Sequence, residues 1–177
     1  AITSEITEVQ AFNLCTVNKQ HKPSSRIVYL REFGHHVFYF YTNYKSRKGE
    51  NISENNNVSM TFFWPGLERQ IRIEGTIEFA EKEKSDAYFN QRPRDSKIGA
   101  WSSPQSNPIH DRTALEVLVN ENAIKFKDKE IDRPEFWGGY KVTANYYEFW
   151  QGRKSRLHDR IAFTLENDNW KIERLAP

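Results

Sequence analysis

The segment "WQGRKSRLHDR", from Trp150 to Arg160, holds the densest group of residues that could do chemistry in this sequence. It contains four cationic side chains, a histidine and a carboxylate next to an indole. Guanidinium groups bind carboxylates and phosphates through charge-assisted hydrogen bonds, and an imidazole can exchange a proton near neutral pH. A solvated surface loop would explain the same charges. The segment by itself therefore leaves two interpretations open, an exposed loop or one wall of an anion-binding pocket.

A second group, "YTNYKSRKGE" over residues 41–50, has the arrangement of a phosphate site. We expect a strand to end near Thr42 and Ser46 to cap a helix whose first turn carries Arg47 and Lys48. Free backbone N–H groups at a helix start bind anions. Cations at that end oppose the helix dipole, so a bound anion would compensate for them. The alternative is an ordinary charged first turn.

Two further stretches carry arginines. In "SSRIVYLR" (24–31), strand alternation places Arg26 with Val28 and Leu30 on one face and Ile27, Tyr29 and Arg31 on the other. An arginine among inward-facing aliphatic residues is costly to bury unless it meets an anion, although a place at the wet end of the strand would remove that cost.

In "AYFNQRPRDSKIGAWSSPQS" (87–106), we expect Pro93 to end a helix and an irregular stretch to follow. Arginines and hydroxyls crowd this stretch, which suits a phosphate monoester better than a metal ion. The residues concerned are Tyr88, Arg92, Arg94 and Ser96.

The elements that must position these groups are mostly strands. Period-two alternation or enrichment in β-branched and aromatic residues predicts strands over 11–17, 24–33, 36–42, 58–64, 68–80, 160–165 and 170–175. A type II turn is expected at Pro65-Gly66, and a hairpin at "ENDN" (166–169). Helices are predicted over about 46–55, 81–90 and 111–126. Consecutive hairpins with few crossover helices favour a mainly β fold with peripheral helices, a closed or partly closed antiparallel barrel in one domain spanning 1–177.

Composition argues against several classes of protein. Net charge is only +2, with 26 basic and 24 acidic residues, so nucleic-acid binding is not predicted. The single cysteine, Cys15, precludes an internal disulfide, fits a reducing compartment, and lies in an apolar run where we expect a buried thiol. No apolar stretch is long enough to span a bilayer and no signal peptide is visible, which predicts a soluble cytoplasmic domain without membrane partners. No metal site is predicted, because the histidines lack ligand spacing.

Seven segments, taken in order, carry a resemblance to a known family. They are "SSRIVYLR", "FYTNYKSRK", "LERQIRIEG", "YFNQRPRDSKIGAWSSPQS", "FWGGY", "EFWQGRKSRLHDR" and "WKIERLAP". Together they resemble the pyridoxamine 5′-phosphate oxidase family, whose fold is an FMN-binding split β-barrel. The resemblance covers the chain from about Ala11 onward, and "RPRDSKIGAW" and "RLHDR" are its specific motifs. The family's N-terminal segment is expected to be absent or truncated here.

The resemblance implies a function and a set of cofactor contacts. It implies a homodimer with FMN sites in the subunit interface. It also implies oxidation of pyridoxamine or pyridoxine 5′-phosphate to pyridoxal 5′-phosphate, with O2 reduced to H2O2. Implied ligands of the FMN phosphate are Arg26, Arg47 and Lys48. Implied contacts to the rest of FMN are Ile27, Val28, Tyr29, Leu30, Arg31, Tyr41, Thr42 and Gln70, with Gln105, Ser106, Trp150 and Arg160 reaching across the interface.

The resemblance also implies a substrate site. Its phosphate would be bound by Tyr88, Arg92 and Ser96, and its pyridine ring would lie among Arg156, Leu157 and His158. Arg156 and His158 are the candidate catalytic residues, Arg156 orienting the substrate and His158 positioning the ring or relaying a proton. Arg31 stands where the family usually has a substrate-phosphate lysine, and an arginine binds through a planar fork instead. For Arg26 and Arg31 to serve neighbouring sites, a bulge or a strand end must lie between them.

Three alternatives remain open at this point. The chain could be a relative of the same fold that oxidises another substrate, as the phenazine-biosynthesis flavoproteins do. It could be a flavin- or pyridoxal-phosphate-binding module without turnover. It could also be an RNA-binding barrel with exposed aromatic residues and scattered arginines.

Overall fold

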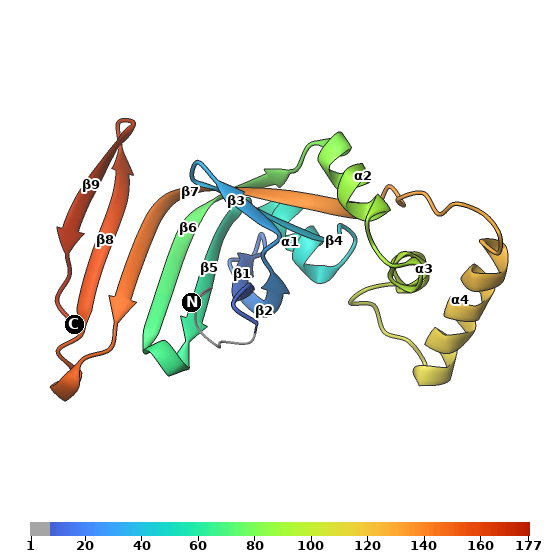
Figure 1. The fold of residues 1–177 in the computed structure, drawn as a ribbon, viewed down its shortest axis with the longest axis horizontal. Helices are drawn as coiled ribbons and strands as arrows, with labels where there is room; N and C mark the ends of the chain where they lie inside the picture. Colours follow the sequence, from blue (N-terminus) through green and yellow to red (C-terminus); the bar gives the residue numbers. More distant parts are fainter. Residues whose placement is uncertain (1–7) are drawn as a thin grey trace.

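The computed structural model describes residues 8–177, which form nine strands, four α-helices and two short 3-10 turns (Figure 1). No helix among these residues has the length and apolar character needed to cross a membrane. The strands are β1 (Ala11–Val17), β2 (Pro23–Tyr29), β3 (Glu32–Gly34), β4 (Val37–Asn43), β5 (Asn57–Trp64), β6 (Arg69–Phe79), β7 (Trp137–Gln151), β8 (Asp159–Glu166) and β9 (Asn169–Arg174). The helices are α1 (Arg47–Glu54), α2 (Lys82–Asn90), α3 (Arg94–Ser102) and α4 (Arg112–Lys125), and the 3-10 turns are Pro65–Leu67 and Lys154–Arg156.

All nine strands belong to one antiparallel sheet that divides at β7. The main path runs β2-β1-β5-β6-β7-β4-β3. The 15-residue β7 pairs with β4 over its first half, Trp137–Thr143, and with β8 over its second half, Tyr146–Gln151. Figure 1 shows the result, with β8 and β9 at one end of the molecule and α2, α3 and α4 at the other.

A register shift marks the point where the sheet divides. Glu74 pairs with Tyr146 but the next residue, Gly75, pairs with Ala144, so Asn145 is extra. Such a bulge bends and twists a strand locally. A Cβ on Gly75 would lie 2.1 Å from the carbonyl oxygen of Thr143, which explains glycine at this position.

Two apolar clusters hold these parts together. The larger lies within the curl of the sheet and includes Phe12, Leu14, Phe40, Met60 and Tyr140. The smaller joins the helices to the start of β7 through Phe89, Ile98, Ile131 and Trp137.

Most predicted elements are confirmed within a few residues, and the predicted mainly β fold with it. The predicted strand 24–33 is interrupted after Tyr29, where the pairing of β2 with β1 ends. The N–H of Arg31 donates instead to the carbonyl of Tyr39 on β4 (2.9 Å). This is the strand end that the Arg26 and Arg31 assignments required. The hairpin at 166–169 is also confirmed, with Asn167 and Asp168 at φ of 50° and 62°.

Three local predictions were wrong. The stretch after Pro93 is not irregular, because it forms α3. Pro65-Gly66 begins a 3-10 turn in which Glu68, not Gly66, has positive φ, so the turn is not type II. Cys15 is half-buried because β1 turns its neighbours Leu14 and Thr16 into the core.

Candidate active site

A cavity of about 1010 Å³ lies where β2, β4, the start of α1 and the α2–α3 region meet. It collects most of the predicted cofactor and phosphate ligands from segments far apart in the sequence. Those lining it are Arg26, Ile27, Val28, Tyr29, Arg31, Tyr41, Thr42, Arg47, Lys48, Tyr88, Arg92, Ser96, Gln105 and Ser106.

Lys48 is the most deeply buried cation of the cavity, with 7% of its surface exposed. Its ammonium group donates to Thr42 Oγ1 (3.0 Å), Ser46 Oγ (3.0 Å) and Gln105 Oε1 (3.2 Å), all neutral acceptors. Burial, followed by the nearby positive charge of Arg26, lowers the pKa of Lys48 to about 8. A cation buried in this way is poorly compensated by its own protein.

Arg26 is the second cation of this group, and its partners are also neutral. Its guanidinium donates to the carbonyl of Leu14 (3.1 Å), Thr16 Oγ1 (2.9 Å) and Ser24 Oγ (2.7 Å). Burial lowers its pKa, and Arg47 acts in the same direction. Within residues 8–177, no carboxylate lies within ion-pair distance of these cations.

The start of α1 completes a cationic cradle, which consists of Arg26, Arg47, Lys48 and the first N–H groups of the helix. Ser46 occupies the N-cap position but makes no side-chain cap, because its hydroxyl donates to the carbonyl of Asn43 (2.6 Å). The first N–H groups of α1 therefore stay available for an anion. Arg47 and Lys48 at the helix start and Arg26 on β2 lack carboxylate partners, an arrangement that suits a phosphate group.

A second group of cations, Arg31 and Arg92, lines the same cavity. The guanidinium of Arg92 covers the ring of Trp137, 4.5 Å from its centroid, and its Nη1 is buried without a hydrogen-bond partner. Burial lowers the pKa of Arg92, and nearby Arg31 lowers it further. Buried unpaired donors are rare in folded proteins, so this one points to an anionic ligand. Arg94 instead caps the carbonyls of Phe126 and Lys129 and does not line the cavity.

Aromatic rings form one wall of the cavity, against which Arg31 and Arg92 lie. Tyr41 and Tyr88 stack with centroids 3.9 Å apart, and Trp137 lies parallel to both. Burial raises the pKa of Tyr41 to about 12, so its hydroxyl remains a neutral hydrogen-bonding group. Glycine is required at 138 and 139, because a Cβ would lie 2.1 Å from the hydroxyl of Tyr44 and 2.8 Å from the ring of Tyr41. The "FWGGY" motif thus packs the wall, a role the sequence alone did not indicate.

Seven of the predicted site residues do not line this cavity. Leu30 packs on the core within the sheet. Gln70, Trp150 and Arg160 are cross-strand partners on β6, β7 and β8 and so share one face of the sheet. Arg156, Leu157 and His158 follow on the adjoining loop.

The loop before β8 holds His158 in a defined orientation. The imidazole lies 4.7 Å from the Trp150 ring, and its Nδ1 accepts the backbone N–H of Arg153 (3.1 Å). A neutral imidazole that accepts through Nδ1 carries its proton on Nε2. Ser155 and Arg156 have φ of 57° and 62°, so the chain takes a left-handed turn in this loop.

Arg153 and Gln105 make contacts within this chain that the sequence did not indicate. Arg153 forms an ion pair with Asp159 (2.7 Å), which also pairs with Arg174. Gln105 was expected to reach a cofactor across a subunit interface. It contacts Thr42 and Lys48 of its own chain, because the segment after α3 folds back over the start of α1.

Comparison with known proteins places this geometry in a family. Residues 1–124 match the family model described as pyridoxamine 5′-phosphate oxidase, and residues 137–177 match the pyridoxine 5′-phosphate oxidase C-terminal dimerisation region. The chain belongs to the pyridoxamine 5′-phosphate oxidase family. The predicted family and the predicted enzyme class, an oxidase, are confirmed.

Relatives within the pyridoxamine 5′-phosphate oxidase family align over nearly the whole chain. The pyridoxine/pyridoxamine 5′-phosphate oxidase of Leptospira biflexa is 51% identical over 96% of this chain and 80% of its own length. That of Cyanothece sp. is 45% identical over 100% of this chain and 83% of its own length. Family membership indicates a flavin cofactor, and the match to a dimerisation region indicates a homodimer.

Solved structures confirm the split-barrel fold. PhzG from Burkholderia lata 383, in complex with tetrahydrophenazine-1-carboxylic acid, superposes with a TM-score of 0.91 at 27% identity, covering 97% of this chain and 84% of its own. A pyridoxamine 5′-phosphate oxidase-related, FMN-binding protein from Nostoc punctiforme has a TM-score of 0.76 at 15% identity, covering 97% and 90%, and supports the fold alone.

Proposed function

We propose that this protein is an FMN-dependent oxidase that converts pyridoxamine 5′-phosphate or pyridoxine 5′-phosphate to pyridoxal 5′-phosphate and reduces O2 to H2O2. The observation that carries the proposal is one cavity, with an aromatic wall, that contains two groups of cations without carboxylate partners. Two separate phosphate groups, one from the cofactor and one from the substrate, would satisfy both.

The first cationic group suits the phosphate of FMN. Arg26, Arg47 and Lys48 would bind its oxygens together with the free N–H groups of α1. Thr42 and Gln105 would turn toward the isoalloxazine side of the cavity. FMN should bind much more tightly than FAD, because the cationic cradle suits the terminal phosphate monoester of FMN, which FAD lacks.

The second group suits the phosphate of the substrate. Arg92 would gain the partner that its Nη1 lacks, and Arg31, Tyr88 and Ser96 line the cavity around it. Arg31 offers up to five donors in a planar fork where a lysine would offer a point charge. The substrate's phosphate would thus be fixed at one end and its pyridine ring directed along the aromatic wall.

The remaining predicted ligands would come from the second subunit. Gln70, Trp150 and Arg160, with the Arg156–His158 loop, form a separate surface that does not face the cavity of the same chain. In a homodimer this surface of one subunit would cover the cavity of the other. Both FMN and substrate would then lie in the interface.

The protein's own task in this reaction is positioning. When bound, the flavin supplies the acceptor for the hydride that leaves the substrate's C4′ carbon. Arg156 would orient the substrate, and His158 would present its Nε2–H to it as a hydrogen-bond donor. The covered interface would exclude water while the amine or alcohol group loses its proton. With the amine substrate, water then supplies the aldehyde oxygen and the nitrogen leaves as ammonia.

A peroxide assay tests this function. Protein reconstituted with FMN is mixed with pyridoxine 5′-phosphate or pyridoxamine 5′-phosphate in air, and H2O2 and pyridoxal 5′-phosphate are measured together. We expect the two products in equal amounts. A flavin-loaded protein that releases neither would contradict the proposal and favour a non-catalytic binding module.

The likeness to PhzG supports one other candidate, oxidation of a reduced phenazine carboxylate. Arg31 and Arg92 would then meet a carboxylate. The same assay with tetrahydrophenazine-1-carboxylic acid decides between them. Faster turnover of that compound than of pyridoxine 5′-phosphate would favour the second candidate.

A further inference from the structure

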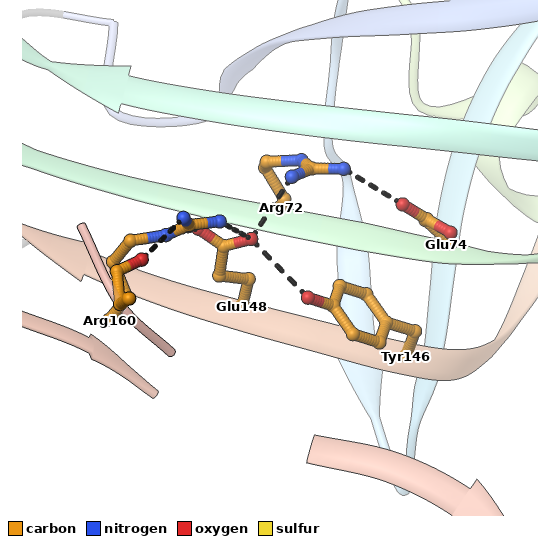
Figure 2. A network of polar contacts seen from close by, with 6 residues as sticks. Arg72, Glu74, Tyr146, Glu148 and Arg160 are labelled. Carbon is orange, nitrogen blue, oxygen red and sulfur yellow. Dashed lines mark hydrogen bonds and ion pairs between the residues drawn. The ribbon is translucent and has the colours of Figure 1, made fainter. Parts of the chain in front are cut away.

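Glu148, in the second half of β7, is a carboxylate that is only 2% exposed and is not among the predicted site residues. Figure 2 shows it between two arginines, with Arg160 on one side and Arg72 on the other. It accepts from Arg160 Nε (2.8 Å) and Nη2 (3.0 Å), from Arg72 Nη1 (3.0 Å) and from the hydroxyl of Tyr146 (3.3 Å). Both carboxylate oxygens are therefore occupied.

The contacts of Arg160 leave part of its guanidinium available. Of its five N–H groups, two donate to Glu148 and one, on Nη1, donates to the carbonyl of Ala176 (2.9 Å). Within the described residues, one N–H on Nη1 and one N–H on Nη2 have no hydrogen-bond partner. Glu148 and the C-terminal segment thus fix the plane of the guanidinium and leave two donors directed away from Glu148.

The sheet places these donors beside the predicted cofactor contacts. Glu148 precedes Trp150 by two residues on β7, so both side chains lie on the same face. Arg160 is the cross-strand partner of Trp150 on β8, and Gln70 is its partner on β6. Glu148 therefore lies one row behind Gln70, Trp150 and Arg160.

Stability alone is a poor explanation for this network. Burying an ion pair removes charges from water, and well-packed apolar residues in its place are often as stable or more so. Hydrogen bonds from Arg160, followed by other nearby positive charge, lower the pKa of Glu148 against the effect of its burial. What the network provides beyond stability is a fixed orientation for Arg160.

We propose that Glu148 is a positioning residue for the flavin site: it holds the guanidinium of Arg160 in the plane that lets its two remaining N–H groups meet the cofactor. This inference rests on the proposed function, in which Arg160 contacts FMN. Glu148 itself touches neither cofactor nor substrate.

The experiment compares Glu148→Gln with Glu74→Gln, a matched control. Glu74 pairs with the same Arg72 (2.9 Å), but its side chain is 46% exposed and does not touch Arg160. Flavin affinity is measured by quenching of FMN fluorescence, and kcat and KM are then measured at saturating FMN. We expect Glu148→Gln to weaken FMN binding at least tenfold and to lower kcat at saturation, and Glu74→Gln to stay within twofold of the wild type.

A double-mutant cycle shows whether Glu148 acts through Arg160. In an Arg160→Lys background, Glu148→Gln should weaken FMN binding by less than twofold further, because the orientation it protects is already lost. Additive losses would overturn the proposal. So would a Glu148→Gln variant that has a lower melting temperature but wild-type FMN affinity and kcat.

A milder variant keeps the test decisive if Glu148→Gln does not fold. Glu148→Asp retains the charge but is one methylene shorter, so it cannot reach both arginines in the same way. The same loss of FMN affinity is expected, and wild-type affinity would overturn the proposal. A wild-type protein that binds FMN but oxidises no B6 phosphate would instead contradict the proposed function and leave the Glu148 affinity comparison intact.

Discussion

Two regions of this molecule gather arginine or lysine side chains, and they differ in what those side chains contact. In the cavity, Lys48 and Arg26 contact only neutral groups, and Arg92 has a buried nitrogen without any partner. On β6, β7 and β8, Arg72 and Arg160 are paired with Glu148. The first arrangement leaves positive charge to be neutralised by a ligand, whereas the second holds its cations in fixed positions. Charge type alone does not distinguish the two, but the partners do.

The largest effect that would test this comparison is expected from Lys48→Met. Losing a charge-assisted contact to the FMN phosphate should weaken binding by about 1.5–3 kcal/mol, or roughly 10- to 150-fold. The ligand-free protein should become more stable, because a buried cation without a carboxylate has been removed. Fluorescence titration and thermal melts without FMN measure the two effects. Lys45→Met, at an exposed position nearby, is the control and should change neither.

Arg92→Met should affect the other end of the cavity. Its guanidinium lies over Trp137 and faces the proposed substrate phosphate, so KM for pyridoxine 5′-phosphate should rise about tenfold, the effect of one lost hydrogen bond to a charged group. FMN affinity should stay unchanged. Arg94→Met, two residues away and outside the cavity, should leave KM unchanged. If Arg92→Met weakens FMN instead, the two cationic groups do not serve separate ligands.

The pKa of Lys48 predicts a pH dependence. Its value of about 8 lies below the ordinary 10.5, so the unfolded chain holds this proton between about pH 8 and 10.5 while the ligand-free folded protein releases it. The ligand-free protein should therefore gain stability as pH rises through this window.

FMN affinity should change in the opposite direction. It should fall up to about tenfold from pH 7 to pH 9, since the phosphate binds the protonated lysine. Fluorescence titrations across this range measure the effect. Lys48→Met should bind FMN weakly at every pH in the range, and a slope like that of the wild type in this variant would assign the titration to another group.

The smallest effect is expected at His158, in the region where contacts fix side chains. Its Nδ1 accepts from Arg153 N–H, which leaves Nε2–H as the donor. His158→Gln places an amide near the position of Nε2 and should retain kcat within about threefold. His158→Asn places it near Nδ1 and should lose up to about tenfold, the value of one neutral hydrogen bond. If both variants lose the same amount of kcat, and lose more than tenfold, His158 transfers a proton in the reaction.

The local sequence determined most strands, three of the four α-helices and the identity of the cavity's cations. Alternation along 68–80 and the turn at "ENDN" depend on neighbouring residues, so they are readable from the chain. Arg26, Arg47 and Lys48 were recognisable because a cation at a helix start or on an inward strand face is locally unfavourable. Helix α3 was missed because Pro93, at its N-cap, suggested an end rather than a beginning.

Only the tertiary structure decided which charges are free and which are paired. β7 was not predicted, since its glycines and its bulge break the alternation that marks a strand. Without β7, nothing in "YYEFW" distinguishes Glu148 from a surface glutamate. Its burial depends on Arg72, 76 residues earlier, and Arg160, 12 residues later. Gln105 likewise reaches Lys48 across 57 positions. A side chain's type is local, but whether its charge is neutralised depends on groups that only folding brings within a few ångströms.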